Sequence, residues 1–387
     1  MTFRAPTRFF GFVLSASCLL VACSSKNSVV AGGDGGASLS CSTDNKPADA
    51  DFCSTCTPVS GSACTAARPV DACCTYVQTP TAGLARGTGL HYSSSNDPTV
   101  DLGCLTTPPV AGATQNVTLA GYVKLFASGN DSQGVKVEVY AEAAGSTGAL
   151  GALIGSFTTS GDDVADPPQT PLPTWSTKCP ADGCKLRTYF VANVPTETPL
   201  IIKTSDATGS GQWSDLYDYN IYFANGATTT TAPVPSTGIQ GFPASGSFAE
   251  YDVSSVAATD VNTVASAAGG LTVAPDKGVI AGEVHDCGDV RISGATVDTD
   301  VAHQGPLFYF NENESDPTPD QSRGPQGIGT SNLGLFGALN LATGTPIHVS
   351  AVGKSGGQNV LLGTYTVQVY AGAVTALSFR GRRPSQK

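Results

Sequence analysis

The feature that most constrains the fold is an internal repeat, in which three different motifs recur in the same order. The first and second pairs share a glycine at the same offset, and the third pair shares an Asn, two Thr and a Pro. The matching segments are 119–123 with 280–284, 134–138 with 294–298, and 193–202 with 340–349. Three ordered matches predict two copies of one structural unit. We place the copies at residues 114–230 and 277–383.

Each copy consists mainly of alternating apolar and polar segments bounded by Gly, Pro, Asn and Asp, which is typical of short strands and turns. Charged residues are only 13% of the chain, and Gly (45) and Pro (25) are abundant, so the composition favours an all-β protein over long helices. The second copy predicts seven strands, at Gly278–Asp286, Ala295–Asp300, Pro306–Glu312, Leu333–Leu341, Thr345–Gly353, Val360–Tyr370 and Val374–Phe379. Seven short strands in one unit indicate a Greek-key β-sandwich.

One short helix is expected in the linker between the copies, residues 231–276. Apolar residues recur at helical spacing over 259–268, Thr259 is in the position of an N-cap, and Gly269 and Gly270 follow as a stop signal. The predicted fold is therefore a pair of tandem seven-stranded β-sandwiches with one connector helix.

The second copy resembles the carboxypeptidase regulatory-like domain, a prealbumin-like or transthyretin-like sandwich. The resemblance rests on Gly278–Asp286, Ile292–Val297 and Leu333–Pro346. The first copy fits the same plan more loosely, with an enlarged middle loop. The resemblance implies a seven-stranded scaffold that often occurs in tandem on exported bacterial proteins. It implies no catalytic residues, because the zinc site of the peptidases belongs to a separate domain.

The N-terminus predicts export and lipidation. Residues 1–22 carry two arginines before a short apolar run, which is the layout of a secretory signal. The Leu-Val-Ala that precedes Cys23 resembles a bacterial lipobox, in which the Cys thiol is diacylated before cleavage; the alternative is an ordinary signal with a chance Cys. Residues 23–40 would be a flexible Ser/Gly tether. We expect the lipid to be the membrane anchor, and Ser24 favours the outer membrane of a Gram-negative bacterium by resemblance to lipoprotein sorting.

The cysteine count agrees with export. Of twelve Cys, ten remain after the signal and Cys23 are set aside, and an oxidising envelope would pair them. Seven of the ten fall in a Cys-rich segment, residues 41–113, that disulfides would have to hold together. A Pro-Ala-Asp-Gly turn predicts a Cys179–Cys184 disulfide, and by parity Cys287 would pair with the odd Cys of the N-terminal cluster. A zinc site in that cluster is the alternative, but the spacing of a second pair is missing.

The sequence contains no recognisable catalytic site. None of the four His lies in a zinc-peptidase motif, so metal-dependent peptidase chemistry is excluded. We interpret His285 as a solvated or hydrogen-bonded imidazole at a strand end. Ser355 lies in a Gly-x-Ser-x-Gly match at 353–357, but strands are predicted on both sides, so a hairpin loop is favoured over a nucleophile elbow. No cofactor or metal is expected, and the net charge of -11 opposes binding to nucleic acid.

Two surface features remain as candidate binding sites. The acidic loop 311–320 offers four carboxylates for Ca²⁺, but it lacks the spacing of a calcium loop and is interpreted as solvated. Trp175, Trp213 and Tyr222 are predicted as exposed ligand contacts. Their neighbours Tyr217, Tyr219, Ile221 and Phe223 alternate in a strand and are predicted to be core.

These features predict a non-catalytic lipoprotein of the cell envelope that acts as a structural or ligand-binding module, with a protein or a glycan as its ligand. The alternative is an accessory protein that recognises carbohydrate at the cell surface. A hydrolase with an unrecognised site is the third hypothesis.

Overall fold

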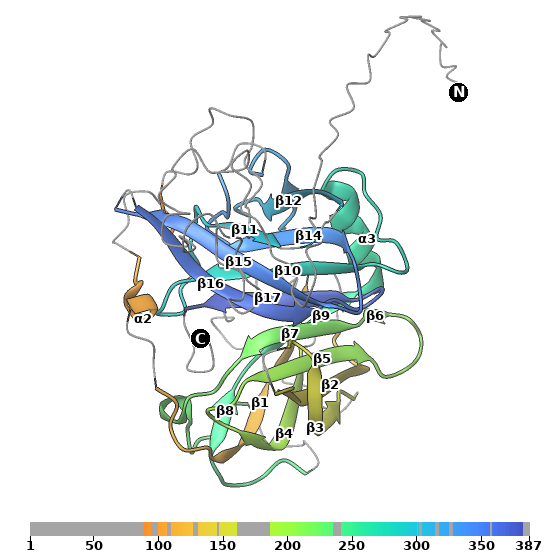
Figure 1. Cartoon of the computed structure of the whole chain (residues 1–387). Helices are drawn as coiled ribbons and strands as arrows, with labels where there is room; N and C mark the ends of the chain where they lie inside the picture. The colour runs from red at the N-terminus through yellow and green to blue at the C-terminus, as the bar shows by residue number, and fades with distance from the viewer. Residues whose placement is uncertain are drawn as a thin grey trace, which may run out of the picture. The chain divides into compact units, whose positions relative to one another are not determined.

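The described part of the chain is mostly β-structure, as the composition predicts (Figure 1). The computed structural model describes residues 89–93, 100–106, 110–126, 131–144, 147–160, 186–234, 241–299, 301, 304–313, 317–324, 328–356 and 358–381. The predicted signal, Cys23, Trp175 and the predicted Cys179–Cys184 pair lie outside these residues. The helices within them are α2 (Gly103–Thr106), η3 (Asn225–Ala227) and α3 (Ala258–Ala267), and none is long and apolar enough to cross a membrane.

Both repeats consist mainly of strands, and those of the second copy follow the predicted order. The first repeat contains β1 (Asn116–Phe126), β2 (Val135–Glu142), β3 (Leu150–Thr158), β4 (Arg187–Pro195), β5 (Leu200–Asp206), β6 (Trp213–Ser214), β7 (Leu216–Ile221), β8 (Phe248–Glu250) and β9 (Val253–Ala257). The second contains β10 (Gly278–His285), β11 (Thr296–Thr299), β12 (Gln304–Phe310), β13 (Pro319–Asp320), β14 (Leu335–Leu341), β15 (Pro346–Ser355), β16 (Gln358–Gln368) and β17 (Val374–Arg380). All seven strands predicted for the second copy are therefore confirmed, with ends shifted by a few residues.

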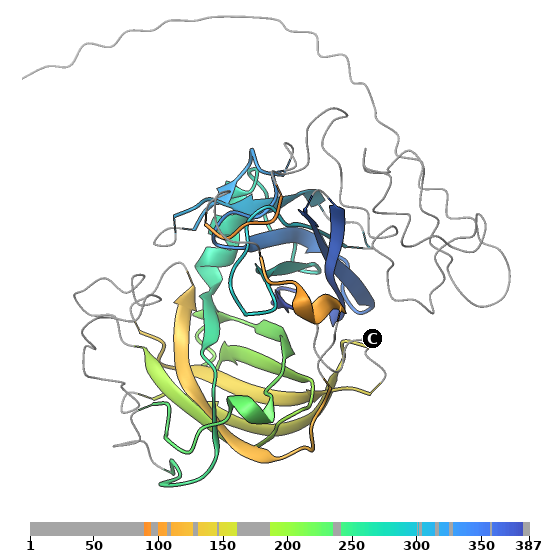
Figure 2. The same ribbon diagram turned by 90° about the vertical axis from the view of Figure 1, so that its left-hand side faces the viewer.

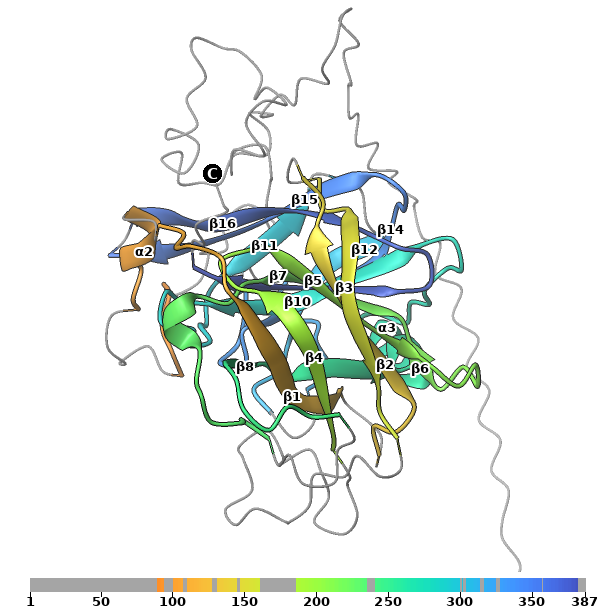
Figure 3. The ribbon, with the colours of Figure 1, turned by 90° about the horizontal axis from the view of Figure 1, so that it is seen from below.

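The strands form three sheets, and the largest one crosses both repeats. Its nine strands have the order β13-β12-β14-β10-β17-β7-β5-β2-β3. Strand β17 of the second repeat pairs in parallel with β7 of the first, and Figure 1 shows these strands side by side where the repeats meet. A second sheet has the order β4-β1-β9-β6 with β8 also paired to β1, and Figure 3 shows β1 and β4 as neighbours in it. The third sheet is β11-β15-β16.

Gly121 and Gly282, the glycines of the first repeated motif, occupy equivalent places on β1 and β10. A Cβ atom on Gly121 would lie 1.9 Å from the carbonyl oxygen of Tyr251, and one on Gly282 would lie 1.8 Å from that of Leu377. Real Cβ atoms do not approach backbone this closely. Both glycines therefore allow the segment that runs parallel to the first strand, β8 to β9 in one repeat and β17 in the other, to pass close against it, and the predicted equivalence is confirmed.

The second and third motifs also place matching residues in matching conformations. Gly134 and Gly294 have φ of 79° and 81°, and Asn193 and Asn340 have φ of 61° and 57°. Asn193 and Asn340 each lie at a bulge, where β4 and β14 shift register against β1 and β10. Asn tolerates this left-handed region better than most residues do, which accounts for its presence at both bulges.

The ladders between these segments keep one register in both repeats. Val137 and Val297, each three residues after its motif glycine, pair with Thr204 and Ala351. Thr204 and Ala351 each lie eleven residues after their bulge asparagine. A slip of one residue would exchange the two faces of a strand, so the agreement confirms the predicted repeat.

The first repeat extends further than predicted, because β8 and β9 lie in the segment interpreted as a linker, residues 231–276. They pair in parallel with β1, as β17 pairs in parallel with β10. The pairing is interrupted around Tyr251, which splits one long strand into two short ones and hides it from pattern analysis. The first repeat therefore needs residues up to 257, well beyond the predicted end at 230.

The connector helix is present as α3, one residue from the predicted position. Its N-cap residue is Ala257 and not Thr259, and no side chain caps it. Gly269 and Gly270 have φ of 139° and 71°, so they end the helix as predicted.

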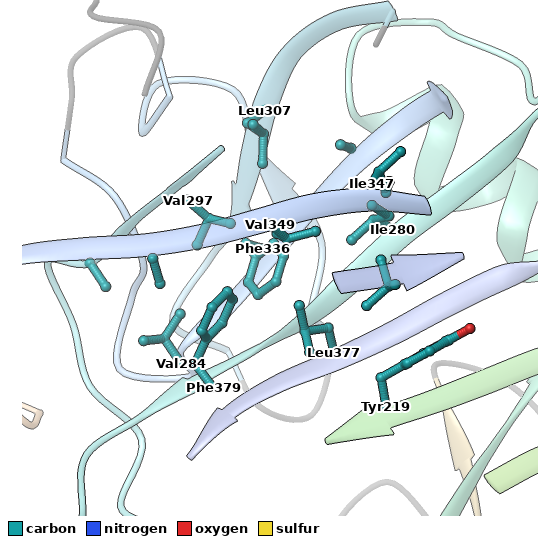
Figure 4. Close-up of a cluster of buried hydrophobic side chains, with 14 of the residues drawn as sticks. Tyr219, Ile280, Val284, Val297, Leu307, Phe336, Ile347, Val349, Leu377 and Phe379 are labelled. Carbon is teal, nitrogen blue, oxygen red and sulfur yellow. The ribbon is translucent and has the colours of Figure 1, made fainter. Parts of the chain in front are cut away.

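The core of the second repeat also contains side chains of the first. In Figure 4, Tyr219 from β7 lies beside Leu377 of β17, in the same cluster as Phe336 and Phe379. The Tyr219 hydroxyl donates to the carbonyl oxygen of Gly148 at 2.7 Å, inside the protein. The described residues accordingly belong to one compact unit. A second core fills the space between β4-β1-β9 and β2-β5, and a third lies beneath α3.

Two described segments before the first repeat, 89–93 and 100–106, are bonded to the second repeat. Cys104 in α2 forms a disulfide with Cys287, and Figure 2 shows α2 beside the strands of the second repeat. The Tyr92 hydroxyl donates to the Asp286 carboxylate at 2.8 Å, and the Cys287 amide donates to the Asp101 carbonyl at 2.9 Å. The prediction that Cys287 pairs with a Cys of the N-terminal cluster is confirmed.

Candidate functional site: a cleft between the repeats

A cleft of about 360 Å³ lies between the two repeats. One wall is the face of the nine-stranded sheet that points away from the core of the second repeat, on β12, β14, β10, β17 and β7. The other wall consists of the end of β1, strand β9 and helix α3. Small-molecule sites in proteins typically have volumes of about 300–1,000 Å³, so the cleft is large enough for a small ligand.

The floor of the cleft is a row of small side chains across three parallel strands. Ala281 of β10 pairs with Ala376 of β17, which pairs with Asp218 of β7. The preceding row is large and apolar, with Val279, Val374 and Leu216. Both alanines are partly exposed although their strands are central in the sheet, whereas the large residues of the preceding row are buried. The change from large to small side chains thus produces the hollow.

One end of the cleft is apolar. Phe308 and Phe310 of β12 face Val261 and Val264 of α3, and Phe126 meets Phe310 edge to face with ring centroids 6.5 Å apart. These side chains belong to the core beneath α3. The apolar lining therefore continues directly from the protein interior.

The other end of the cleft is lined by charged side chains that are bonded to one another in a network. Glu283 accepts from His285 Nε2 at 2.7 Å and from Arg291 Nη2 at 2.8 Å. Asp289 lies 3.0 Å from His285 Nδ1 and accepts from Arg380 Nη1 at 2.7 Å. Each cation in this network has a carboxylate partner, so the network is electrostatically balanced.

The pKa values follow from these contacts. Burial alone would raise the pKa of Glu283, but the hydrogen bond from His285 and the charge of Arg291 hold that pKa well below its usual range. Burial alone would lower the pKa of His285, but its hydrogen bonds to Asp289 and Glu283 raise it above its usual range. The interpretation of His285 as a hydrogen-bonded imidazole at a strand end is confirmed.

Asp218 is the carboxyl group between the apolar and charged ends. Its side chain is almost fully buried, with an exposed fraction of 9%, and Oδ2 accepts from the Tyr251 hydroxyl at 2.5 Å. Burial raises the pKa of Asp218 to about 6, although the hydrogen bond from Tyr251 and the charge of Arg380 act in the opposite direction. Among the described residues, Asp218 forms no ion pair.

Of the three predicted ligand contacts, Trp213 and Tyr222 are described, and neither lines the cleft. Trp213 is buried in the core of the first repeat, with an exposed fraction of 5%, and its Nε1 donates to the Gln133 carbonyl at 3.2 Å. The prediction of an exposed Trp213 is therefore wrong. Tyr222 is half-buried and donates to the Glu197 carboxylate, away from the cleft. The predicted core positions are confirmed, since all four are buried: Tyr217, Tyr219, Ile221 and Phe223.

Two further candidate sites, Ser355 and part of the acidic loop 311–320, lie in the described residues. Ser355 pairs with Gln358 across a tight connection between β15 and β16, which is the predicted hairpin and not a strand-to-helix elbow. In the described part of the acidic loop, Glu312 and Asp320 both pair with Arg323. No group of three or more potential metal ligands occurs among the described residues.

The cleft was not predicted from the sequence, although one residue gave a signal for it. Asp218 alternates with Tyr217 and Tyr219 on a strand whose aromatic face is predicted to be core. An acidic residue on the second face of a central strand is unusual, because that face is normally buried as well. The partners of Asp218 could not be read from the chain, since they come from β17 and from the turn between β8 and β9.

Comparison with known proteins does not assign the chain to a family. No protein-family model matches the sequence, and no curated protein matches it. Among solved structures, the full-length major pilin SpaD from Corynebacterium diphtheriae is similar at 9% identity, with a TM-score of 0.13. The match covers 66% of this chain and 64% of the pilin. A similarity this weak carries no argument about fold or function.

Proposed function

We propose that this protein is a non-catalytic, lipid-anchored protein of the bacterial cell envelope, and that its two repeats bind a small amphipathic ligand in the cleft between them. The observation that carries the proposal is the floor formed by Ala281 and Ala376. Both strands are central in a sheet, where large side chains would normally fill the space beneath a helix. A hollow with one apolar end and one polar end suits a ligand with the same division.

The scaffold we propose is a pair of seven-stranded Greek-key sandwiches of the carboxypeptidase regulatory-like type. The matching ladders of the two repeats support a common topology for both. The cleft then forms where the second sandwich exposes the outer face of one sheet to the end of the first. A single sandwich would lack one wall of the site.

The surroundings of His285 support a non-catalytic role. Both of its ring nitrogens are engaged, one by Glu283 and the other by Asp289. Among the described residues of the cleft, no serine hydroxyl forms a hydrogen bond with His285 or with Asp218. Nucleophilic catalysis needs such a contact between hydroxyl and base. A carbohydrate platform built on Trp213 is not proposed, because its indole ring is buried.

The lipid anchor and the location come from the sequence. Diacylation of Cys23 would hold the protein on a membrane, and the Ser/Gly tether at residues 23–40 would separate the binding domains from the surface. We place the protein at the outer membrane of a Gram-negative bacterium. A ligand-binding domain in that position would take up or deliver a small molecule in the envelope.

Filling the cleft tests the binding function. Octan-1-ol serves as a neutral amphipathic probe, and its affinity is measured by titration calorimetry. Ala376→Leu fills the hollow without entering the core on the opposite face of β17 and should weaken octanol binding at least tenfold. Ala244→Leu introduces the same side chain at an exposed loop position and should leave binding unchanged. Absence of binding to the natural protein, or equal binding by Ala376→Leu, would contradict the proposal.

A further inference from the structure

The acids of the cleft differ in their partners. Asp252 forms an ion pair with Lys124 at 3.1 Å, and Glu283 is bonded to Arg291 and His285. Asp260 lies in the first turn of α3, where the helix amides favour a negative charge. Within the described structure, Asp218 receives only the neutral hydroxyl of Tyr251. Among these described acids, Asp218 is therefore the one that is held only by a neutral hydrogen-bond donor, although the charge of Arg380 acts on it from a distance.

The position of Asp218 places its carboxylate beside empty space. On the β17 side its partner in the ladder is Ala376, so that side of Asp218 borders the hollow floor, whereas on the β5 side its partner is the buried Ile202. A carboxylate has about four acceptor sites, and Tyr251 occupies one of them. A buried carboxylate without an ion pair is costly, and a cationic ligand would offset that cost.

We propose that Asp218 anchors a ligand that carries a protonated amine on an apolar body; this inference rests on the ligand-binding function proposed above. The ammonium group would donate to the Asp218 carboxylate. The apolar body would lie over Ala281 and Ala376 and point towards Phe308 and Val261. Both parts of the ligand then meet a matching part of the cleft.

A ligand with an anionic head is disfavoured by the same arrangement. The cations that face the cleft are already paired, with Lys124 held by Asp252, Arg291 by Glu283 and Arg380 by Asp289. A carboxylate placed beside Asp218 would meet a like charge in a poorly solvated site. The amine is therefore the head group that this surface favours.

Binding of an amine should depend on pH through Asp218. Tyr251 donates to its carboxyl group, Arg380 of β17 stabilises its charge, and Glu283 of β10 opposes it. The pKa of Asp218 is raised to about 6, so the carboxyl group loses its charge below that pH. The advantage of an amine over an alcohol should therefore shrink as the pH falls from 7.5 to 5.

The experiment compares octylamine, octan-1-ol and octanoate by titration calorimetry at pH 7.5 and pH 5. At pH 7.5 octylamine should bind at least tenfold more tightly than octan-1-ol, and octanoate more weakly than either. Asp218→Asn should abolish the preference for the amine while octan-1-ol still binds. Asp276→Asn, which removes an exposed carboxylate outside the cleft, should keep the preference.

The outcomes separate this proposal from the function on which it rests. If octan-1-ol binds but octylamine binds no more tightly, or if Asp218→Asn keeps the preference, the amine assignment is wrong and the ligand-binding function stands. Tighter binding of octanoate also overturns the assignment. Failure of all three probes to bind overturns both. The comparison of ligands on the natural protein decides the matter even if Asp218→Asn does not fold.

Discussion

Asp218→Asn should make the protein more stable, because the natural residue keeps a charge in a poorly solvated place. The pKa of Asp218 rises from 3.8 to about 6 on folding. An acid whose pKa is raised in the folded state stabilises that state only when protonated, and this contribution is lost as the pH rises through about 6. A shift of about two units at about 1.36 kcal/mol per unit corresponds to about 3 kcal/mol.

Asparagine has nearly the same shape as aspartate and stays neutral. Its side-chain oxygen can accept the hydrogen bond that Tyr251 donates to Asp218. We therefore expect Asp218→Asn to exceed the natural protein in unfolding free energy by about 3 kcal/mol at pH 8. The difference should shrink to near zero at pH 4, where the aspartate is protonated in the folded protein.

Urea denaturation of both proteins between pH 4 and pH 8 measures this difference. Other groups also titrate in the range, including His285, whose pKa is raised on folding. They contribute equally to both proteins and cancel in the difference. Asp276→Asn serves as the control, because it removes an exposed carboxylate. A variant that is less stable than the natural protein at pH 8, or a difference that does not change with pH, would refute the reasoning.

Three further predictions rest on the fold, and a fourth rests on the N-terminal sequence. Gly121→Val and Gly282→Val should each lower the unfolding free energy by about 3 kcal/mol or more in denaturation measurements, because the new side chain would clash with backbone atoms. Gly226→Val is the control and should be tolerated, because nothing lies within 4 Å of its Cβ position. Cys287→Ser removes the Cys104–Cys287 disulfide, which closes a loop of 183 residues, and should lower the unfolding free energy by about 5 kcal/mol under oxidising conditions. An unchanged urea midpoint would show that this disulfide does not stabilise the protein. The two repeats should unfold in one calorimetric transition, because they share a sheet and a core, and two well-separated transitions would argue against that coupling. Cys23→Ala should abolish incorporation of a palmitate analogue and membrane association, and incorporation that persists would exclude lipidation at Cys23.

The repeat was predictable because it depends on residues with few substitutes. Gly121 and Gly282 are needed where two backbones approach closely, and Asn193 and Asn340 hold left-handed conformations at the bulges. Such positions restrict the choice of residue locally, so they stay recognisable in a chain. Residues that pair between strands lie the same number of residues from these positions in both repeats, which indicates how strands that are far apart in sequence pair with each other.

The cleft was not predictable, because it depends on pairings between repeats. Ala281 and Ala376 are ordinary small residues until β10 and β17 place them side by side. Asp218 reaches them only because β7 continues the sheet of the other repeat. No local pattern in the sequence reports that continuation.

Trp213 shows why one predicted ligand contact was wrong. An aromatic residue next to a Gly/Ser-rich turn is typically predicted to be exposed. In the fold, β6 pairs with β9 and turns the indole ring into the core, where its N–H finds the Gln133 carbonyl. Strand β9, which buries Trp213, lies in the segment that was predicted to be a linker. Because β9 was not predicted, the burial of Trp213 was not predicted either.

The most direct test of a ligand site between the repeats is a crystal structure of the protein grown with octylamine. We expect an alkyl chain over Ala281 and Ala376, beneath α3, with its nitrogen within hydrogen-bond distance of the Asp218 carboxylate. A structure in which α3 closes onto the two alanines, or in which the amine binds only elsewhere on the surface, would contradict it.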